Sequence, residues 1–254
     1  MVLELRGLTK IFGGLRAIED VSFRVKRGSI MSIIGPNGAG KTTLFNCLTG
    51  VLPSTRGRIM FENEDITNKK PYEITARGMA RTFQNIRVFG AMTVLENVMI
   101  GQHTRSSEGL FTAILGTGRF LKEEEEIRNR AFEYLEFVGI QDYSDSLAEN
   151  LPYGDQKRLE IARALATEPK ILLLDEPAAG MNPQETLALM GLIQKIRQLG
   201  KTVIVIEHDM KVVMGISEWI AVLDHGVKIA EGTPVEIRNN HNVIEAYLGK
   251  EEVL

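Results

Sequence analysis

The chain has 254 residues, of which 44% are hydrophobic, and it carries a formal net charge of −3 at pH 7. This length and composition suit one large or two small globular domains with a sizeable core. The weak negative charge excludes a protein that binds nucleic acid through a broad basic surface. A single cysteine excludes an internal disulfide, and no apolar run approaches the length of a membrane-spanning helix.

The first part of the chain alternates between short apolar patterns and turns. Strands are predicted at residues 2–5, 21–25, 29–34 and 58–62. Lys26-Arg27-Gly28 predicts a tight hairpin between the second and third of these strands. We therefore expect the N-terminal strands to form a mixed sheet.

A glycine-rich segment follows the strand predicted at residues 29–34. It fits the pattern G-x-x-x-x-G-K-[ST] and consists of Gly35, Pro36, Asn37, Gly38, Ala39, Gly40, Lys41 and Thr42. Its glycines allow successive backbone N–H groups to face one anion, and a helix beginning near Lys41 adds its positive end. We expect Lys41 to reach the β- and γ-phosphates of a nucleotide, Thr42 to ligate Mg²⁺, and Thr43 to contact a phosphate.

An aromatic residue lies upstream of this phosphate loop. Phe12 occurs in the segment Lys10-Ile11-Phe12-Gly13. Its ring could stack on a nucleotide base or pack in the core, and the surrounding residues favour neither alternative.

The middle of the chain is mainly helical. Helices are predicted at residues 71–78, 93–101, 122–138 and 153–167. Pro71 begins the first of them, and Thr93 with Glu96 forms a capping box at the start of the second. Residues 102–119 predict an insertion with a short amphipathic element that packs on its own domain or docks on a partner. The acidic residues 123–126 predict a solvated helix start and no metal site.

The last third of the chain alternates strands and helices. Strands are predicted at residues 171–174, 203–206, 219–223 and 227–230, a helix at 182–199, and short helices from about 234. Asn182 caps the long helix, with Pro183 at its first position, and residues 224–226 predict a hairpin turn. The order of elements indicates an α/β fold with a helical insertion of roughly 70 residues.

Two carboxylates follow the apolar strand predicted at residues 171–174. Open α/β sheets bind ligands at the carboxyl ends of their strands, so Asp175 and Glu176 are expected at such a site. Asp175 can hold Mg²⁺ through water, while Glu176 points the other way and can orient an attacking water. This is the positioning chemistry that phosphoryl transfer needs.

The next strand, at residues 203–206, ends in Glu207-His208-Asp209. The corresponding position of this strand end predicts that His208 faces a γ-phosphate. A serine hydrolase is not supported, because the sequence lacks a G-x-S-x-G elbow. A zinc site is not supported either, because paired His or Cys spacing is absent.

Taken together, these positions resemble the ATP-binding subunits of ABC transporters, and the resemblance covers nearly the whole chain. Residues 35–43 match the Walker A loop, and Asp175 and Glu176 match Walker B and its catalytic glutamate. His208 matches the switch histidine. The resemblance implies that Phe12 is the aromatic residue that stacks on adenine.

Two further motifs of the family are matched. Gln84 matches the Q-loop glutamine, which the resemblance makes a sensor of Mg²⁺ and the γ-phosphate and a member of the catalytic set. Residues 151–156 match the signature motif, so Tyr153, Gly154 and Asp155 are expected to face the nucleotide of a second chain. Backbone N–H groups at Gly154 and the following helix N-terminus could donate to its phosphate.

Both the signature and the D-loop depart from the usual pattern of the family. Pro152 replaces the signature serine, Tyr153 replaces its first glycine, and Asp155 stands at the glutamine position. The D-loop at residues 179–182 ends in Asn182 in place of aspartate.

Within the family, the chain is most similar to ATPases that power branched-chain amino-acid import. The similar segments are residues 81–84, 151–154, 175–183, 206–211 and 232–249. The resemblance implies an ATP- and Mg²⁺-dependent ATPase whose partners are a second ATP-binding subunit, identical or related, and membrane permease subunits. A substrate-binding protein is an indirect partner, and no nucleic acid is expected. The chain is expected at the cytoplasmic face of the inner or plasma membrane, attached through the permease.

The resemblance also implies the domain organisation. We expect a P-loop ATPase core with a mixed sheet, an antiparallel N-terminal β subdomain and an inserted helical subdomain. All residues from 1 to 254 would form one domain, with the core at about 1–84 and 169–254 and the insertion at about 85–168. Residues 87–102 are expected to form the groove that receives a permease helix.

Three other classes of ATPase or GTPase compete with this interpretation. ATPases of lipopolysaccharide or other lipid export share the Y-G signature and a similar D-loop. DNA-maintenance ATPases of the same superfamily need long coiled coils, and no sustained heptads separate Lys41 from Leu151. A regulatory GTPase needs an N-K-x-D motif, and the segment Asn68-Lys69-Lys70-Pro71 lacks the aspartate.

Overall fold

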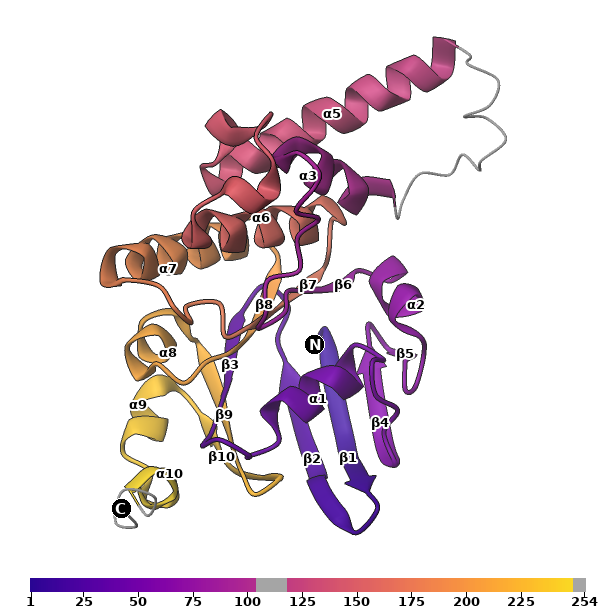
Figure 1. The fold of residues 1–254 in the computed structure, drawn as a ribbon. Coiled ribbons are helices and arrows are strands. Elements are labelled where there is room, and N and C mark those ends of the chain that lie inside the picture. The colour runs from indigo at the N-terminus through magenta and orange to yellow at the C-terminus, as the bar shows by residue number, and fades with distance from the viewer. Residues whose placement is uncertain (104–117, 249–254) are drawn as a thin grey trace.

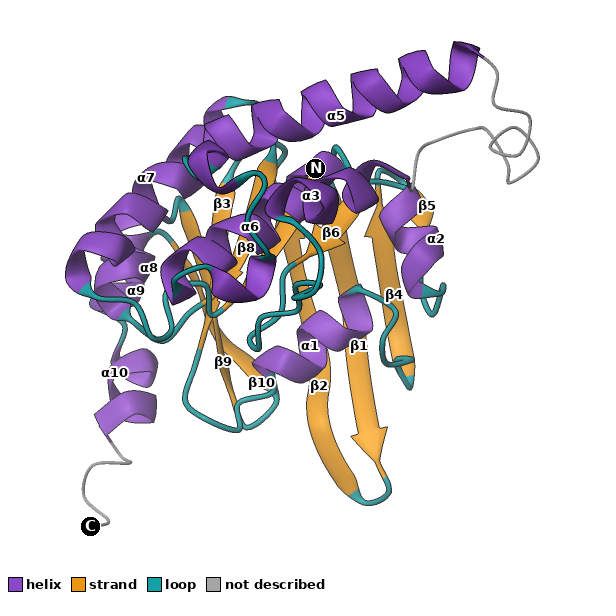
Figure 2. Ribbon diagram, turned by 45° about the horizontal axis from the view of Figure 1, so that its top comes forward, coloured by secondary structure: helices purple, strands orange, loops and turns teal. Residues whose placement is uncertain are grey.

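A computed structural model describes residues 1–103 and 118–248. The strands form two sheets (Figure 1 and Figure 2). The first sheet is antiparallel, has the order β2-β1-β4-β5, and contains β1 (Leu3–Phe12), β2 (Leu15–Val25), β4 (Arg56–Phe61) and β5 (Glu64–Asp65). The amphipathic element expected within residues 102–119 lies largely outside the described residues.

The second sheet has the strand order β10-β9-β3-β8-β7-β6. It contains β3 (Ile30–Ile34), β6 (Met79–Arg81), β7 (Ile171–Asp175), β8 (Thr202–Ile206), β9 (Trp219–Asp224) and β10 (Val227–Gly232). Every neighbouring pair is parallel except β9 and β10, which form the predicted hairpin. All five residues of β3, β7 and β8 are buried, as expected for parallel strands covered on both faces.

Helices cover these sheets and form a separate helical layer. The helices are α1 (Lys41–Leu48), α2 (Pro71–Ala76), α3 (Val94–His103), α5 (Gly118–Val138), α6 (Tyr153–Ala166), α7 (Pro183–Gln198), α8 (Met210–Ile216), α9 (Pro234–Arg238) and α10 (His241–Leu248). Short 3₁₀ turns occupy Gln141–Tyr143 and Ala148–Asn150. No helix in the described part of the chain combines the length and apolar character that crossing a membrane requires.

The two faces of the second sheet pack against different layers. On one face, α1 lies between the sheets, and its Phe45 shares a hydrophobic cluster with Leu5 of β1 and Ile33 of β3. On the other face, Leu174 of β7 shares a cluster with Leu165 of α6. The same cluster continues into α3 and α5, so α6 joins the helical layer to the sheet (Figure 1).

Local capping signals are borne out. Thr93 and Glu96 exchange the two hydrogen bonds of a capping box at the start of α3. Asn182 accepts from the backbone of Glu185 at the start of α7, and Pro183 is the first residue of that helix.

The hairpin predicted at residues 26–28 is wrong. The strands on either side of this segment belong to different sheets. Gly28, at φ 69°, turns the chain, and its N–H donates to Oγ1 of Thr202, the first residue of β8, at 2.9 Å. Strand β3 is mostly apolar and buried on both faces, and it lies between the parallel strands β8 and β9 instead of pairing with β2. The N-terminal strands therefore divide between two sheets.

Candidate functional site

The phosphate loop connects the end of β3 to the start of α1. Gly35 and Gly40 have φ values of 151° and 96°. A Cβ on Gly35 would lie 2.0 Å from the carbonyl oxygen of Leu223, and one on Gly40 would lie 2.5 Å from that of Ala17. Both positions therefore require glycine for backbone conformation and for close packing against the neighbouring hairpins.

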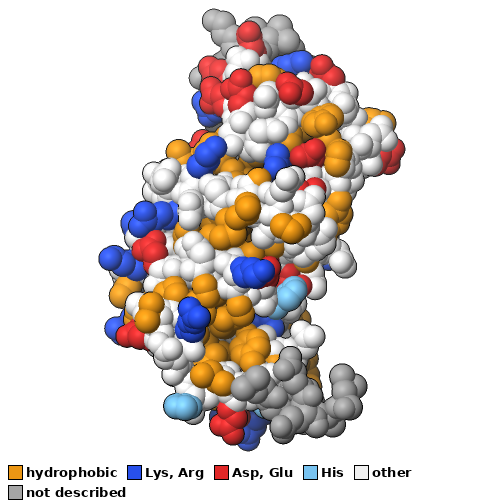
Figure 3. Space-filling model, turned by 90° about the vertical axis from the view of Figure 1, so that its left-hand side faces the viewer, with side chains coloured by type: hydrophobic (Ala, Val, Ile, Leu, Met, Phe, Trp, Pro, Cys, Tyr) orange, Lys and Arg blue, Asp and Glu red, His pale blue; other side chains and the backbone are white. Residues whose placement is uncertain are grey.

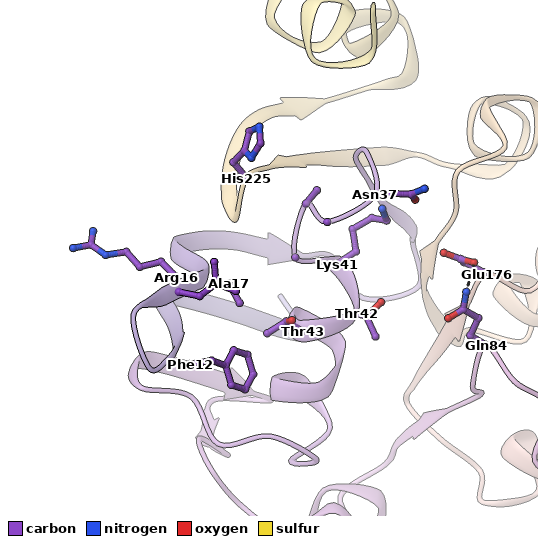
Figure 4. Close-up of a pocket in the computed structure, with 14 residues that line it drawn as sticks. Phe12, Arg16, Ala17, Asn37, Lys41, Thr42, Thr43, Gln84, Glu176 and His225 are labelled. Atoms are coloured by element: carbon purple, nitrogen blue, oxygen red, sulfur yellow. Dashed lines mark hydrogen bonds between the residues drawn. The ribbon is translucent and has the colours of Figure 1, made fainter. Parts of the chain in front are cut away.

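Lys41 closes the phosphate loop from inside. Its Nζ donates to the carbonyl oxygens of Gly35 at 2.7 Å and Pro36 at 3.0 Å, and the residue is only 7% exposed. The ammonium group and the N-terminus of α1 thus place positive charge at the same loop (Figure 4).

A cavity of about 540 Å³ opens over the phosphate loop. Its lining consists of Phe12, Leu15, Arg16, Ala17, Asn37, Gly38, Ala39, Gly40, Lys41, Thr42, Thr43, Gln84, Glu176 and His225. Phe12 is 43% exposed and is therefore not a core residue. The volume falls in the range of sites for small molecules and cofactors.

Three polar side chains meet beyond the loop. Gln84 Nε2 donates to Glu176 Oε2 at 2.8 Å, and His208 Nδ1 lies 4.0 Å from the same oxygen (Gln84 and Glu176 in Figure 4). Glu176 follows β7 with φ 46°, a left-handed conformation that non-glycine residues seldom adopt. Such strain is typical of functional sites, where the surrounding structure holds it in place.

Asp175, the last residue of β7, directly precedes Glu176 and is 2% exposed. Arg81, at the end of β6, donates to Asp175 Oδ2 at 2.7 Å and to Asn46 Oδ1 of α1 at 2.7 Å. The ion pair is buried, with 6% and 3% of the two side chains exposed. Arg81 thus connects the helix of the phosphate loop to the carboxylate at the end of β7.

Glu207 supports the neighbouring loop. It is 1% exposed, and its carboxylate accepts from the N–H groups of Ala178 at 2.8 Å and His208 at 3.1 Å. Burial raises the pKa of the Glu207 carboxyl, although these hydrogen bonds oppose the rise. The Glu207 carboxylate thus holds the segment after Glu176 next to the backbone of His208.

The signature segment lies apart from the cavity. Pro152 precedes α6, and Tyr153, Gly154 and Asp155 form its first turn. Tyr153 is 46% exposed, and its ring lies so close to Gly180 that a Cβ added to that glycine would be 3.1 Å from it. None of these three residues lines the cavity of this chain.

The structure therefore brings most of the expected residues together and leaves the signature residues outside. It also adds cavity residues that the sequence motifs did not indicate, among them Arg16, Ala17 and His225. His225 occupies the predicted hairpin turn, but nothing in that turn pattern indicates that it reaches the phosphate loop. Arg81 gives only a faint signal, as a charged residue ending a short apolar strand.

The model of the family described as "ABC transporter" matches residues 18–179. The chain is 48% identical over 250 residues to the high-affinity branched-chain amino acid transport ATP-binding protein LivG of Salmonella typhimurium, covering 98% of each protein. The chain belongs to the ABC transporter family.

Other comparisons agree with this family. BraF of Pseudomonas aeruginosa, with the same description as LivG, is 46% identical, again with 98% of both chains covered. The crystal structure of the ADP conformation of an ATP-binding cassette from an ABC transporter has a TM-score of 0.85 and 37% identity, covering 98% of each chain. A second family model, described as "Branched-chain amino acid ATP-binding cassette transporter", matches residues 227–253.

This ABC family chain is consequently a nucleotide-binding protein and an ATPase. The expected family and α/β fold class are confirmed, with the antiparallel N-terminal sheet as a distinct unit. The relatives do not favour the lipid-export alternative. Neither DNA maintenance nor GTP hydrolysis finds support in these comparisons.

Proposed function

We propose that this ABC ATPase powers the uptake of branched-chain amino acids, with ATP hydrolysed at the cavity over the phosphate loop. The main support is the convergence of Lys41 and Thr42 with Gln84 and Glu176 in one cavity. The 2.8 Å hydrogen bond between Gln84 and Glu176 supports a joint action of these two side chains at the γ-phosphate. The substrate class is supported by similarity to relatives described as branched-chain amino acid transport proteins.

In this proposal, the nucleotide lies along the cavity. Phe12 stacks on the base, and the backbone N–H groups of residues 35–43 surround the phosphates. Lys41 neutralises the β- and γ-phosphates, and Thr43 adds a hydroxyl contact. Because phosphoryl transfer is mostly positioning and charge stabilisation, these contacts supply much of its catalysis.

Glu176 acts on the attacking water. Its carboxylate accepts a hydrogen bond from the water, orients it in line with the γ-phosphate and takes up its proton as the bond forms. Gln84 holds the Glu176 carboxylate through its 2.8 Å hydrogen bond. His208, 4.0 Å away, faces the γ-phosphate in this proposal and stabilises its developing charge.

The donor set fits Mg²⁺ bound together with a nucleotide. The described residues hold no cluster of three or more His, Cys, Asp or Glu side chains that could bind a metal alone. Mg²⁺ usually combines one or two protein oxygens with phosphates and water, and Thr42, Asp175 and Gln84 offer such oxygens. When bound, the ion would neutralise phosphate charge. Arg81 keeps the buried Asp175 carboxylate paired.

We also propose that the chain acts in a two-ATPase sandwich with an identical or related subunit. Tyr153, Gly154 and Asp155 lie outside their own cavity, and Tyr153 is exposed although Gly154 is buried, which supports a contact of this helix start with the nucleotide of a partner. A dimeric cassette with 28% identity and a TM-score of 0.78 supports this arrangement. Hydrophobic side chains also gather on the face that carries α7, α8 and α9 (Figure 3), a property common at protein interfaces.

Permease subunits complete the proposed transporter. The core at about 1–84 and 169–254 would bind nucleotide, and the helical insertion at about 85–168 would carry the groove for a permease helix. Attachment to the permease would hold the chain at the cytoplasmic face of the inner or plasma membrane. A substrate-binding protein would deliver the amino acid to the permease.

The test uses Glu176→Gln, which should retain ATP and hydrolyse it slowly. Light scattering should show dimers with Mg-ATP and monomers without it. In the Glu176→Gln background, Asn182→Ala removes both the D-loop side chain and the helix cap, whereas Asn182→Ser changes the D-loop side chain and keeps a cap. Comparing the two variants separates the D-loop contribution from capping. A monomer at high protein and ATP concentrations would contradict homodimerisation. Copurification with permease subunits and identification of the bound amino acid would test the transported substrate.

A further inference from the structure

Helix α6 presents two buried charged side chains to the loop that carries Gln84. Lys157 is 3% exposed, and its Nζ donates to the backbone carbonyl oxygen of Gln84 at 2.9 Å. Glu160 is 2% exposed, and its Oε1 accepts from the N–H of Phe83 at 3.1 Å. One face of α6 therefore binds backbone groups of two successive loop residues, the N–H of Phe83 and the carbonyl of Gln84.

Both side chains occupy an environment that disfavours their charges. Burial lowers the pKa of Lys157 and raises the pKa of Glu160. Apolar side chains would often stabilise such a position equally well or better. The charged pair is thus poorly explained by stability alone, whereas its two hydrogen bonds fix the direction of the loop backbone.

The ring of Phe83 gives the loop a third attachment. The Arg81 guanidinium lies 5.0 Å from the ring centroid, and that of Arg87 lies 4.4 Å from it. Contacts of this length are favourable cation–π interactions. With its backbone and its ring held, the loop delivers the Gln84 amide to Glu176.

Lys157 lies one turn along α6 from Tyr153, at the signature end of the helix. A helix moves as a rigid element over such a distance. Displacement of Tyr153 and Gly154 therefore displaces Lys157, and Lys157 is hydrogen-bonded to the loop of Gln84.

We propose that Lys157 and Glu160 are positioning residues that attach the Gln84 loop to α6, so that movement of the signature end repositions the Gln84 amide at Glu176. The proposal rests on the two-ATPase sandwich proposed above. In that dimer, the signature of one chain contacts the nucleotide of its partner. The attachment therefore couples the partner's nucleotide to the chain's own catalytic group, which is a coupling between two sites.

The first experiment measures amide hydrogen exchange in the full-length chain without nucleotide, so it does not depend on dimerisation. Glu160→Leu removes the acceptor of the Phe83 N–H, and Glu160→Gln keeps an amide oxygen there. We expect exchange in residues 82–86 to accelerate about fivefold or more in Glu160→Leu, the scale of one lost hydrogen bond, and much less in Glu160→Gln. Equal exchange in wild type and Glu160→Leu would overturn the proposal.

The second experiment measures the ATP dependence of hydrolysis. Lys157→Met removes the donor to Gln84, and Lys157→Arg keeps one. We expect ADP affinity within about twofold of wild type in both variants, because Lys157 does not line the cavity. The Hill coefficient of hydrolysis should fall from near the two-site limit toward about one in Lys157→Met and be restored in Lys157→Arg.

The outcomes separate this inference from the proposed function. A chain that stays monomeric in the Glu176→Gln test contradicts the sandwich, and with it the coupling between sites, even if the exchange result holds. A dimer that hydrolyses ATP without cooperativity, or whose cooperativity survives Lys157→Met, overturns the coupling alone. If a single variant fails to fold, the double variant Lys157→Met with Glu160→Leu removes both charges together and repeats both measurements.

Discussion

The phosphate loop and the Gln84 loop face the same cavity but are built in different ways. The phosphate loop consists of consecutive residues, and Lys41 bonds to carbonyl groups only six and five positions away. The Gln84 loop is held by contacts from distant segments. Its carbonyl accepts from Lys157, 73 positions later in the chain, and its side chain bonds to Glu176, 92 positions later.

This difference in construction assigns nucleotide binding to the phosphate loop and the regulation of hydrolysis to the Gln84 loop. A loop held by its own lysine and by the neighbouring hairpins can hold phosphates whatever the helical layer does. A loop held by α6 on one side and by the end of β7 on the other changes its geometry when these elements move relative to each other. We therefore expect damage to the first loop to remove nucleotide binding, and damage to the second to alter hydrolysis and transport in the nucleotide-bound protein.

The largest effect is expected for Lys41→Ala. Loss of a buried charged hydrogen-bond donor to phosphate should weaken Mg-ATP binding about 30-fold or more and reduce hydrolysis to background. Calorimetry and a phosphate-release assay measure the two effects. Lys195→Ala, at an exposed position on α7, is the control and should change neither. Unchanged Mg-ATP affinity in Lys41→Ala would show that the phosphates bind elsewhere.

Glu176→Gln comes next. It removes the base but keeps an amide of the same shape, so nucleotide binding should persist while hydrolysis falls about 10²-fold or more. Single-turnover hydrolysis on preloaded protein measures the chemical step. The exposed Glu245 of α10 provides a matched control, Glu245→Gln. Near-normal turnover in Glu176→Gln would assign the water-orienting role to another residue.

Gln84→Ala tests the second loop directly. Nucleotide affinity should stay within about tenfold, or roughly 1.4 kcal/mol. Transport by the reconstituted complex should fall more than basal hydrolysis by the isolated chain, because the loop connects α6 to Glu176. Gln198→Ala, at the exposed end of α7, is the control. Equal losses would make Gln84 only catalytic, and no loss would remove it from the mechanism.

The smallest effect is expected for Thr93→Ala, at the start of α3. The hydroxyl of Thr93 accepts from the Glu96 N–H at 3.1 Å, so its loss should destabilise the chain by about 1 kcal/mol. Urea denaturation followed by circular dichroism measures this change, and Thr93→Ser should restore most of it. If ADP affinity fell as well, the phosphate loop would depend on the helical layer, and the two loops would not differ in the way described.

The features that could be predicted from the sequence show the same division. Residues 35–43, the capping residues Thr93 and Asn182, and the carboxylates after β7 depend on neighbours in the chain, and their patterns show in short segments. The buried pair of Arg81 and Asp175 spans 94 positions, and no local pattern indicates it. Contacts of this kind depend on which strands become neighbours.

The error at residues 26–28 has the same origin. A basic turn between two apolar strands favours a hairpin when only local residues are considered. The actual partners of β3 are β8 and β9, which the chain supplies far downstream. Thr202, which accepts from Gly28, is 174 positions away. The signal that decides the pairing therefore lies outside any local window.

Strands β6 and β7 are direct neighbours in the sheet, although residues 82–170 separate them in the chain. Bringing the two strands together during folding closes a long loop, which costs entropy that grows only with the logarithm of loop length. Helices rich in local contacts form quickly, so early formation of α3, α5 and α6 would shorten this loop before the strands pair. Changes in the length of the segment between β6 and β7 would then alter the folding rate of the sheet only weakly.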